Sequence, residues 1–115
     1  MNEKIGALRS FLDGAHSFFH SVAEMTRQLD QAGYTRLIES EEWALTPGGK
    51  YYVTRNDSAV IAFRVPVGAP KGFLLSASHA DRPTFKLKEN GELAGAYTRL
   101  AVERYGGMLI APWLD

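Results

Sequence analysis

The tripeptide His79-Ala80-Asp81 brings together an imidazole and a carboxylate at a spacing suited to metal chemistry. It follows the apolar run 73–78 and precedes Arg82. If that run is a strand, residues two apart project to the same side, so the carboxylate can orient the imidazole. A carboxylate often does this behind a metal-bound histidine. Because His-x-Asp is a short pattern, a strand-end pair that faces solvent is the competing interpretation.

The bulk composition restricts the class of protein. A chain of 115 residues allows one domain with one modest core. The 13 basic and 13 acidic residues give a formal net charge of zero, so charge offers no reason to expect nucleic acid or an anionic membrane as a partner. The sequence has no cysteine, which excludes disulfides and thiolate metal sites and fits a reducing compartment. No signal peptide or membrane-spanning stretch is visible in the sequence.

Two helices are expected in the first third of the chain. Apolar residues three to four apart over 5–12 predict a helix that ends near Gly14. Ser17 is a suitable N-cap for a second helix, and Gly33 sits where a left-handed C-cap is expected. The apolar stripe that begins at Phe18 recurs at helical spacing. We therefore expect the second helix to cover a sheet.

Strand-like segments dominate the remainder. The stretch 34–49 looks irregular, 59–65 is apolar enough to be buried on both faces, and Asn90-Gly91 is a tight-turn signal. The predicted fold class is α/β, with N-terminal helices packed on a mixed sheet. The expected strands are 51–54, 59–65, 73–78, 84–88 and 96–103.

The last eight residues, 108–115, are largely apolar. A complete domain rarely ends in its most hydrophobic stretch, because such an end leaves sticky surface or unfilled strand pairing. We therefore expect residues 1–115 to be the N-terminal piece of a longer chain.

Several motifs, in one order and over nearly the whole chain, resemble those of the aspartyl aminopeptidase family. Residues 74–83 resemble the family's gAHTDSP motif, and 102–107 with Trp113-Leu114-Asp115 are similar to its VExYGG…WFDRDL segment. Further matches are Ser17-Phe18-Phe19-His20 to SPFH, together with Gly33-Tyr34, Glu42-Trp43 and 50–56.

The resemblance carries expectations about fold and activity. Members of the family are cytoplasmic aminopeptidases that use two zinc ions and prefer an acidic residue at the peptide N-terminus. Their catalytic domain is an α/β/α sandwich interrupted by a β-rich assembly domain, and they form large tetrahedral homo-oligomers. Residues 1–115 would then be the first part of the catalytic domain, with the assembly domain and the remaining metal ligands absent.

Four residues receive roles through the resemblance. His79 matches the first zinc ligand, and Asp81 matches the catalytic carboxylate that orients it. Arg82, where the family usually has serine, could pair with an acidic substrate side chain or point to solvent. His20 matches a family histidine that could reach the active-site region or serve as a hydrogen-bonded structural residue. Because a catalytic zinc needs about three protein ligands, we expect this piece alone to bind zinc weakly and to be inactive.

Other interpretations remain open at the level of sequence. The chain could be a non-catalytic interaction module or truncated paralogue that self-associates. A metal-free hydrolase built on His79 and Asp81 lacks a convincing nucleophile, because Ser76 and Ser78 are not in a Gly-x-Ser-x-Gly elbow.

Several residue types that could do chemistry have simpler interpretations. The carboxylates of Glu41 and Glu42 are expected to be a solvated pair, and His16 to be exposed near a helix start. The two tryptophans, Trp43 and Trp113, are expected to be packing anchors.

Overall fold

The computed structural model describes residues 3–114, so Met1, Asn2 and the Asp115 of the C-terminal motif lie outside the described residues. The chain divides into two compact units, Met1–Asp81 and Arg82–Asp115. No helix within residues 3–114 is long and apolar enough to cross a membrane.

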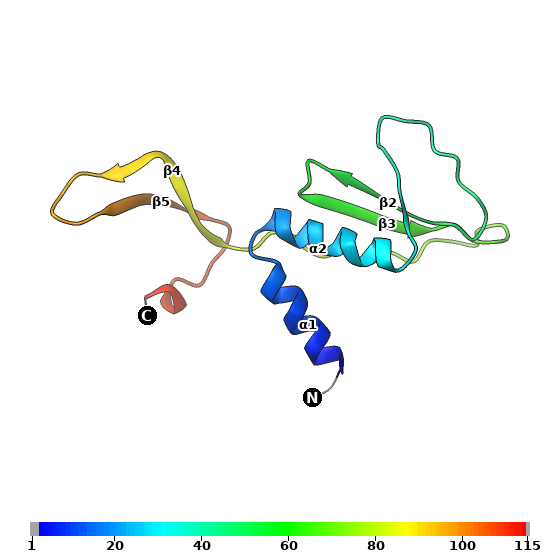
Figure 1. The fold of residues 1–115 in the computed structure, drawn as a ribbon, viewed down its shortest axis with the longest axis horizontal. Helices are drawn as coiled ribbons and strands as arrows, with labels where there is room; N and C mark the ends of the chain where they lie inside the picture. The colour runs from blue at the N-terminus through cyan, green and yellow to red at the C-terminus, as the bar shows by residue number, and fades with distance from the viewer. Residues whose placement is uncertain (1–2, 115) are drawn as a thin grey trace. The chain divides into compact units, whose positions relative to one another are not determined.

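The first unit combines two helices with a three-stranded sheet. Helix α1 spans Glu3–Gly14 and helix α2 spans Phe18–Gln31. Helix α2 lies along the sheet and contacts strand β3 (Ala59–Arg64), while α1 contacts α2 and leads away from it at an angle (Figure 1). The predicted class, helices on a mixed sheet, is confirmed.

Both predicted caps of α2 are present. The Ser17 hydroxyl accepts the backbone N–H of His20 at 3.4 Å, which satisfies one of the unpaired amides of the first turn. At the other end Gly33 has φ +76°, and the N–H of Tyr34 donates to the carbonyl of Leu29 at 3.0 Å. This is a Schellman ending, whose left-handed residue favours glycine.

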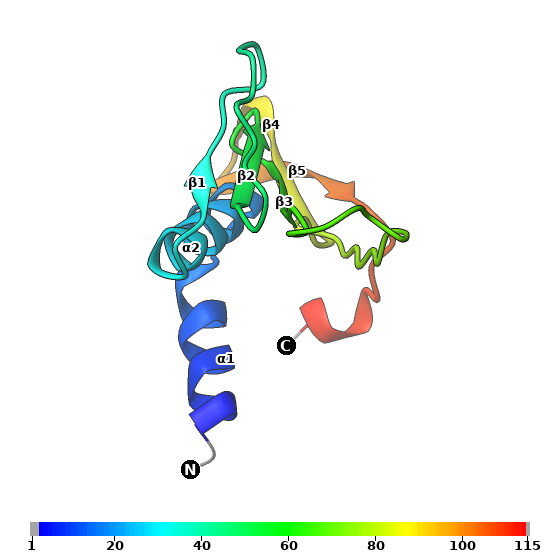
Figure 2. The same cartoon turned by 90° about the vertical axis from the view of Figure 1, so that its right-hand side faces the viewer.

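The sheet has the order β1-β2-β3 and is mixed. Strand β1 (Thr35–Arg36) lies beside β2 (Lys50–Arg55) in Figure 2 and runs parallel to it, whereas β2 runs antiparallel to β3. Strands β2 and β3 are joined through Asn56 and Asp57, both at φ +51°. These residue types tolerate the left-handed turn that suits strand twist.

The core of this unit takes buried side chains from α2 and from both faces of β2, because the adjacent Tyr51 and Tyr52 project to opposite sides of the strand. Its buried apolar residues are Ala15, Val22, Tyr51 and Tyr52. The Tyr52 hydroxyl donates to Asp30 Oδ1 at 2.8 Å, which joins the middle of β2 to the end of α2. Tyr51 lies so close to Gly49 that a Cβ there would be 2.5 Å from its ring, so this position requires glycine.

Two strand expectations in this unit are wrong. Strand β3 is not buried on both faces: Ile61 is 67% exposed, because α2 covers only one side of the sheet. The stretch 73–78 forms no strand and lies in the irregular segment 65–83, where Phe73 and Leu75 are about nine-tenths exposed. A strand needs a neighbour for its N–H and C=O groups, and within residues 3–114 none pairs with this stretch.

The second unit is a two-stranded antiparallel hairpin followed by a short 3-10 helix. Strand β4 spans Thr84–Leu93, β5 spans Arg99–Tyr105, and the 3-10 helix η1 spans Ala111–Trp113. The Trp113 ring meets the Phe85 ring edge to face at 5.0 Å.

The predicted turn at Asn90-Gly91 is wrong. Both residues lie inside β4, where Asn90 has φ +53° and the register shifts between Leu87 and Glu92. Such an irregularity accommodates the left-handed residue without ending the strand. The chain instead reverses over 94–98.

Candidate functional site

His79 and Asp81 are in direct contact. The imidazole Nδ1 lies 2.8 Å from Asp81 Oδ1. The backbone here is not a strand, and a bend at Ala80 brings the two side chains together. Since an ionised carboxylate can only accept, Nδ1 carries the proton of this contact, and in the neutral imidazole the lone pair is then on Nε2. The arrangement is the one that a carboxylate imposes on a metal-binding histidine.

Exposure leaves the imidazole accessible to a ligand. The side chain of His79 is 90% exposed, and that of Asp81 is 38% exposed. A neutral imidazole with a free Nε2 fits one ligand position of a zinc ion. Within residues 3–114, however, no three His, Cys, Asp or Glu side chains converge where they could hold a metal. The described residues therefore supply one ligand and its orienting group, not a complete centre.

The other two site candidates have different outcomes. Arg82 is exposed and belongs to the second unit, and its substrate-binding role stays a prediction. His20 is exposed on α2, with Nδ1 2.9 Å from the Ser17 hydroxyl and its ring 5.8 Å from that of His16. The structure thus shows His20 as a hydrogen-bonded residue at the helix start, and its role in an active site stays a prediction.

Each tryptophan packs on a phenylalanine ring, although Trp43 stays 40% exposed and Trp113 49% exposed. Trp43 Nε1 donates to the carbonyl of Ile38 at 2.8 Å, and its ring stacks on Phe63 with centroids 6.1 Å apart. Trp113 packs on Phe85 in the second unit. Both Glu41 and Glu42 are exposed in the loop before β2.

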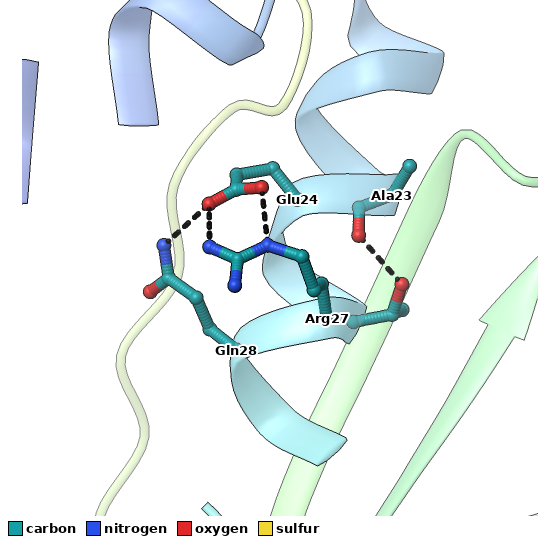
Figure 3. A network of polar contacts seen from close by, with 5 residues as sticks. Ala23, Glu24, Arg27 and Gln28 are labelled. Carbon is teal, nitrogen blue, oxygen red and sulfur yellow. Dashed lines mark hydrogen bonds and ion pairs between the residues drawn. The ribbon is translucent and has the colours of Figure 1, made fainter. Parts of the chain in front are cut away.

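A carboxylate that the sequence did not reveal, Glu24, lies on the side of α2 that faces the groove with α1, and its side chain is 17% exposed. Figure 3 shows Glu24 accepting from Arg27 Nε at 2.8 Å and from Gln28 Nε2 at 3.1 Å. These hydrogen bonds, that from Arg27 above all, lower the pKa of Glu24 to about 2. Arg27 and Gln28 follow Glu24 by three and four residues, and this helical spacing could have predicted the contacts from the sequence.

This network borders an open groove of about 710 Å³ between α1 and α2. Its apolar part includes Leu8 and Phe11. Because Glu24 is ionised and already engaged by Arg27, it is unsuited to proton transfer. We therefore assign no catalytic role to the groove.

Comparison with known proteins points to one family. The family model described as "Aminopeptidase I zinc metalloprotease (M18)" matches residues 11–115. The probable M18 family aminopeptidase 2 of Pseudomonas aeruginosa is 45% identical over 111 residues, which is 94% of this chain and 26% of that protein. The protein of the same description from Pseudomonas putida is 43% identical over the same shares.

Solved structures agree with this result. The S. cerevisiae mApe1 dodecamer superposes with a TM-score of 0.86 at 31% identity, covering 98% of this chain and 27% of that one. Chaetomium thermophilum mApe1 superposes with a TM-score of 0.79 at 34% identity, covering 94% of this chain and 26% of that one. The chain thus spans about a quarter of the length of these relatives.

Proposed function

This chain belongs to the M18 aminopeptidase family, and from that premise we propose that it forms the N-terminal part of the catalytic domain of a zinc aminopeptidase. The proposed reaction is the removal of an amino-terminal acidic residue, Asp or Glu, from a peptide. The proposed setting is the cytoplasm and a homo-oligomer, in keeping with a chain that has no cysteine and with a structural relative that is a dodecamer.

The observation that carries the proposal is the hydrogen bond between His79 Nδ1 and Asp81 Oδ1. Asp81 holds the proton on Nδ1 and limits rotation of the ring. Nε2 is then the nitrogen that would hold zinc. A bound zinc supplies an activated water and polarises the scissile carbonyl. Arg82 would add a fixed positive charge for the acidic substrate side chain.

A chimera tests this proposal directly. Residues 1–115 would replace the matching quarter of the Pseudomonas aeruginosa relative, and release of amino-terminal Asp or Glu from a peptide would be measured. We expect the chimera to be active, His79→Ala to abolish activity, and Asp81→Asn to lower it by about 10–100-fold. Lys71→Ala, an exposed change in the same irregular segment, is the matched control.

The outcomes separate the claims. Unchanged activity in His79→Ala would refute its assignment as a ligand. A folded but inactive chimera would refute the role proposed for the whole segment. A preference for neutral amino-terminal residues would refute only the acidic specificity.

For the isolated chain we propose no peptidase activity and weak zinc binding at His79, since one imidazole leaves most coordination positions to water. Tight zinc binding that disappears in His79→Ala, measured by calorimetry, would contradict this.

The second candidate function is an interaction module that self-associates. It draws support from exposed apolar side chains, such as Leu74 at 102% and Leu100 at 53%. Sedimentation velocity over a wide concentration range decides this: a chain that stays monomeric throughout is no self-associating module.

A further inference from the structure

Two imidazoles outside the proposed catalytic site lie side by side at the start of α2. The ring centroids of His16 and His20 are 5.8 Å apart, and the rings meet edge to face at 71°. Both residues are exposed, so solvent and ions reach them. No function discussed above uses this pair as a pair.

Local structure orients one of the two rings. Ser17 is the N-cap of α2, with φ −136° and ψ 171°, and its hydroxyl is 2.9 Å from His20 Nδ1. The same hydroxyl accepts the backbone N–H of His20. In the tautomer whose Nδ1–H donates to this hydroxyl, Nε2 of His20 carries the lone pair that a metal ion would bind.

The spacing of the rings is close to that of two histidines sharing one metal ion. With zinc–nitrogen bonds of about 2.0–2.1 Å and a tetrahedral angle, the two ring centroids would be about 5.2 Å apart. The observed 5.8 Å is therefore within reach of small side-chain rotations. We propose that His16 and His20 form a two-histidine site for a divalent transition-metal ion, with water in the remaining positions.

The surroundings indicate a modest affinity. The start of a helix carries partial positive charge, which opposes a cation. The carboxylate one turn further along α2, Glu24, is held by Arg27 and Gln28. Two neutral imidazoles prefer metals in the order Co²⁺ < Ni²⁺ < Cu²⁺, with Cu²⁺ above Zn²⁺.

The test is a metal titration of the untagged 115-residue chain, with Ni²⁺ and Cu²⁺ followed by calorimetry. His16→Gln removes one donor and leaves the Ser17 cap and the His20 ring in place. We expect this variant to bind each ion about a hundredfold more weakly, because the second donor of a linked pair acts at high effective concentration. His20→Gln should show the same loss.

His79→Gln is the matched control, since it removes the other exposed imidazole discussed here. It should leave the affinity of the pair unchanged, whether or not the proposed peptidase function holds. Circular dichroism confirms that α2 is retained in each variant. Equal affinity in His16→Gln and the parent chain would overturn the proposal, as would binding that only His79→Gln abolishes.

Discussion

The chain contains two antiparallel hairpins that differ in what covers them. In the β2–β3 hairpin, Tyr51 and Tyr52 are 7% and 3% exposed. In the β4–β5 hairpin, the cross-strand partners Leu87 and Val102 are 59% and 41% exposed. The β2–β3 hairpin is accompanied by a helix and a third strand, as Figures 1 and 2 show for α2 and β1.

The difference illustrates that strand pairing alone stabilises little. A lone two-stranded hairpin is marginal in water, whereas a third strand or a packed helix supplies the missing burial. In the first unit this burial is reinforced by the Tyr52–Asp30 hydrogen bond. We therefore expect stability to be concentrated in the first unit.

The most severe test of this comparison is truncation of a buried aromatic residue. Tyr52→Ala should lower the free energy of unfolding of the first unit by about 3–5 kcal/mol, through a cavity between α2 and the sheet. Val102→Ala, at the half-exposed position, should cost below about 1 kcal/mol. Equal losses would contradict the assignment of stability to the covered hairpin.

The two tryptophans make this measurable unit by unit. Trp43 stacks on Phe63 of β3, and Trp113 packs on Phe85 of β4. In Trp113→Phe the remaining fluorescence comes from Trp43 and reports urea unfolding of the first unit. In Trp43→Phe it comes from Trp113 and reports the second unit. Only the Trp43 signal should shift in Tyr52→Ala.

Amide hydrogen exchange tests the comparison without mutation. Amides of β2 that pair with β3 should exchange about a hundredfold or more slowly than those of β4 that pair with β5, which corresponds to about 2.7 kcal/mol of extra opening free energy. Equal protection in the two hairpins would show that β4–β5 is stabilised by something other than its pairing.

A smaller effect is expected from the Tyr52 hydroxyl alone. Tyr52→Phe should cost about 0.5–1.5 kcal/mol by removing the bond to Asp30. Burial, followed by the neighbouring Asp30, raises the pKa of Tyr52 in the folded state. A raised pKa contributes stability below the ordinary tyrosine value of about 10, which is lost as the pH rises through the folded pKa.

Thermal unfolding at neutral and alkaline pH measures this contribution. The difference in stability between the parent chain and Tyr52→Phe should shrink above about pH 10. A difference that grows with pH would contradict the direction of the pKa shift.

The smallest change is expected at Glu24 of α2, which lines the groove between α1 and α2. The pKa of Glu24 is lowered to about 2 by Arg27 and Gln28. The stabilisation from a lowered carboxylate pKa is present above the ordinary value of about 4.3 and is lost as the pH falls toward 2. An NMR titration should show the carboxyl pKa of Glu24 returning toward its ordinary value in Arg27→Ala, with Arg9→Ala as the control.

The parts of the fold that local chemistry determines were predictable from sequence. Ser17 and Gly33 cap α2 by their own side-chain and backbone preferences, and Asn56-Asp57 makes the turn for the same reason. What failed depends on distant neighbours. The apolar stretch 73–78 carries the composition of a strand, but composition does not provide a pairing partner.

Asn90-Gly91 shows the opposite failure. Its residues favour a two-residue turn, yet the pairing of β4 with β5 continues past them. Asn90 lies where the register of that pairing shifts. The candidate site was predictable only in part, since the contact of His79 with Asp81 was expected from a strand but is made by a bend at Ala80. The exposure of the His79–Asp81 site depends on the backbone path, which residue types do not specify. The same holds for the pairing of His16 with His20.

The short parallel pairing of β1 with β2 has a consequence for the order of folding events. Thr35 pairs with Tyr51 across a connection that contains no helix, whereas β2 and β3 are joined by a tight turn. A hairpin of this kind forms in about 1–10 μs, while longer loops must first pay closure entropy. The β2–β3 hairpin is therefore positioned to form first and to act as the template on which β1 adds last, drawing the end of α2 onto Tyr52.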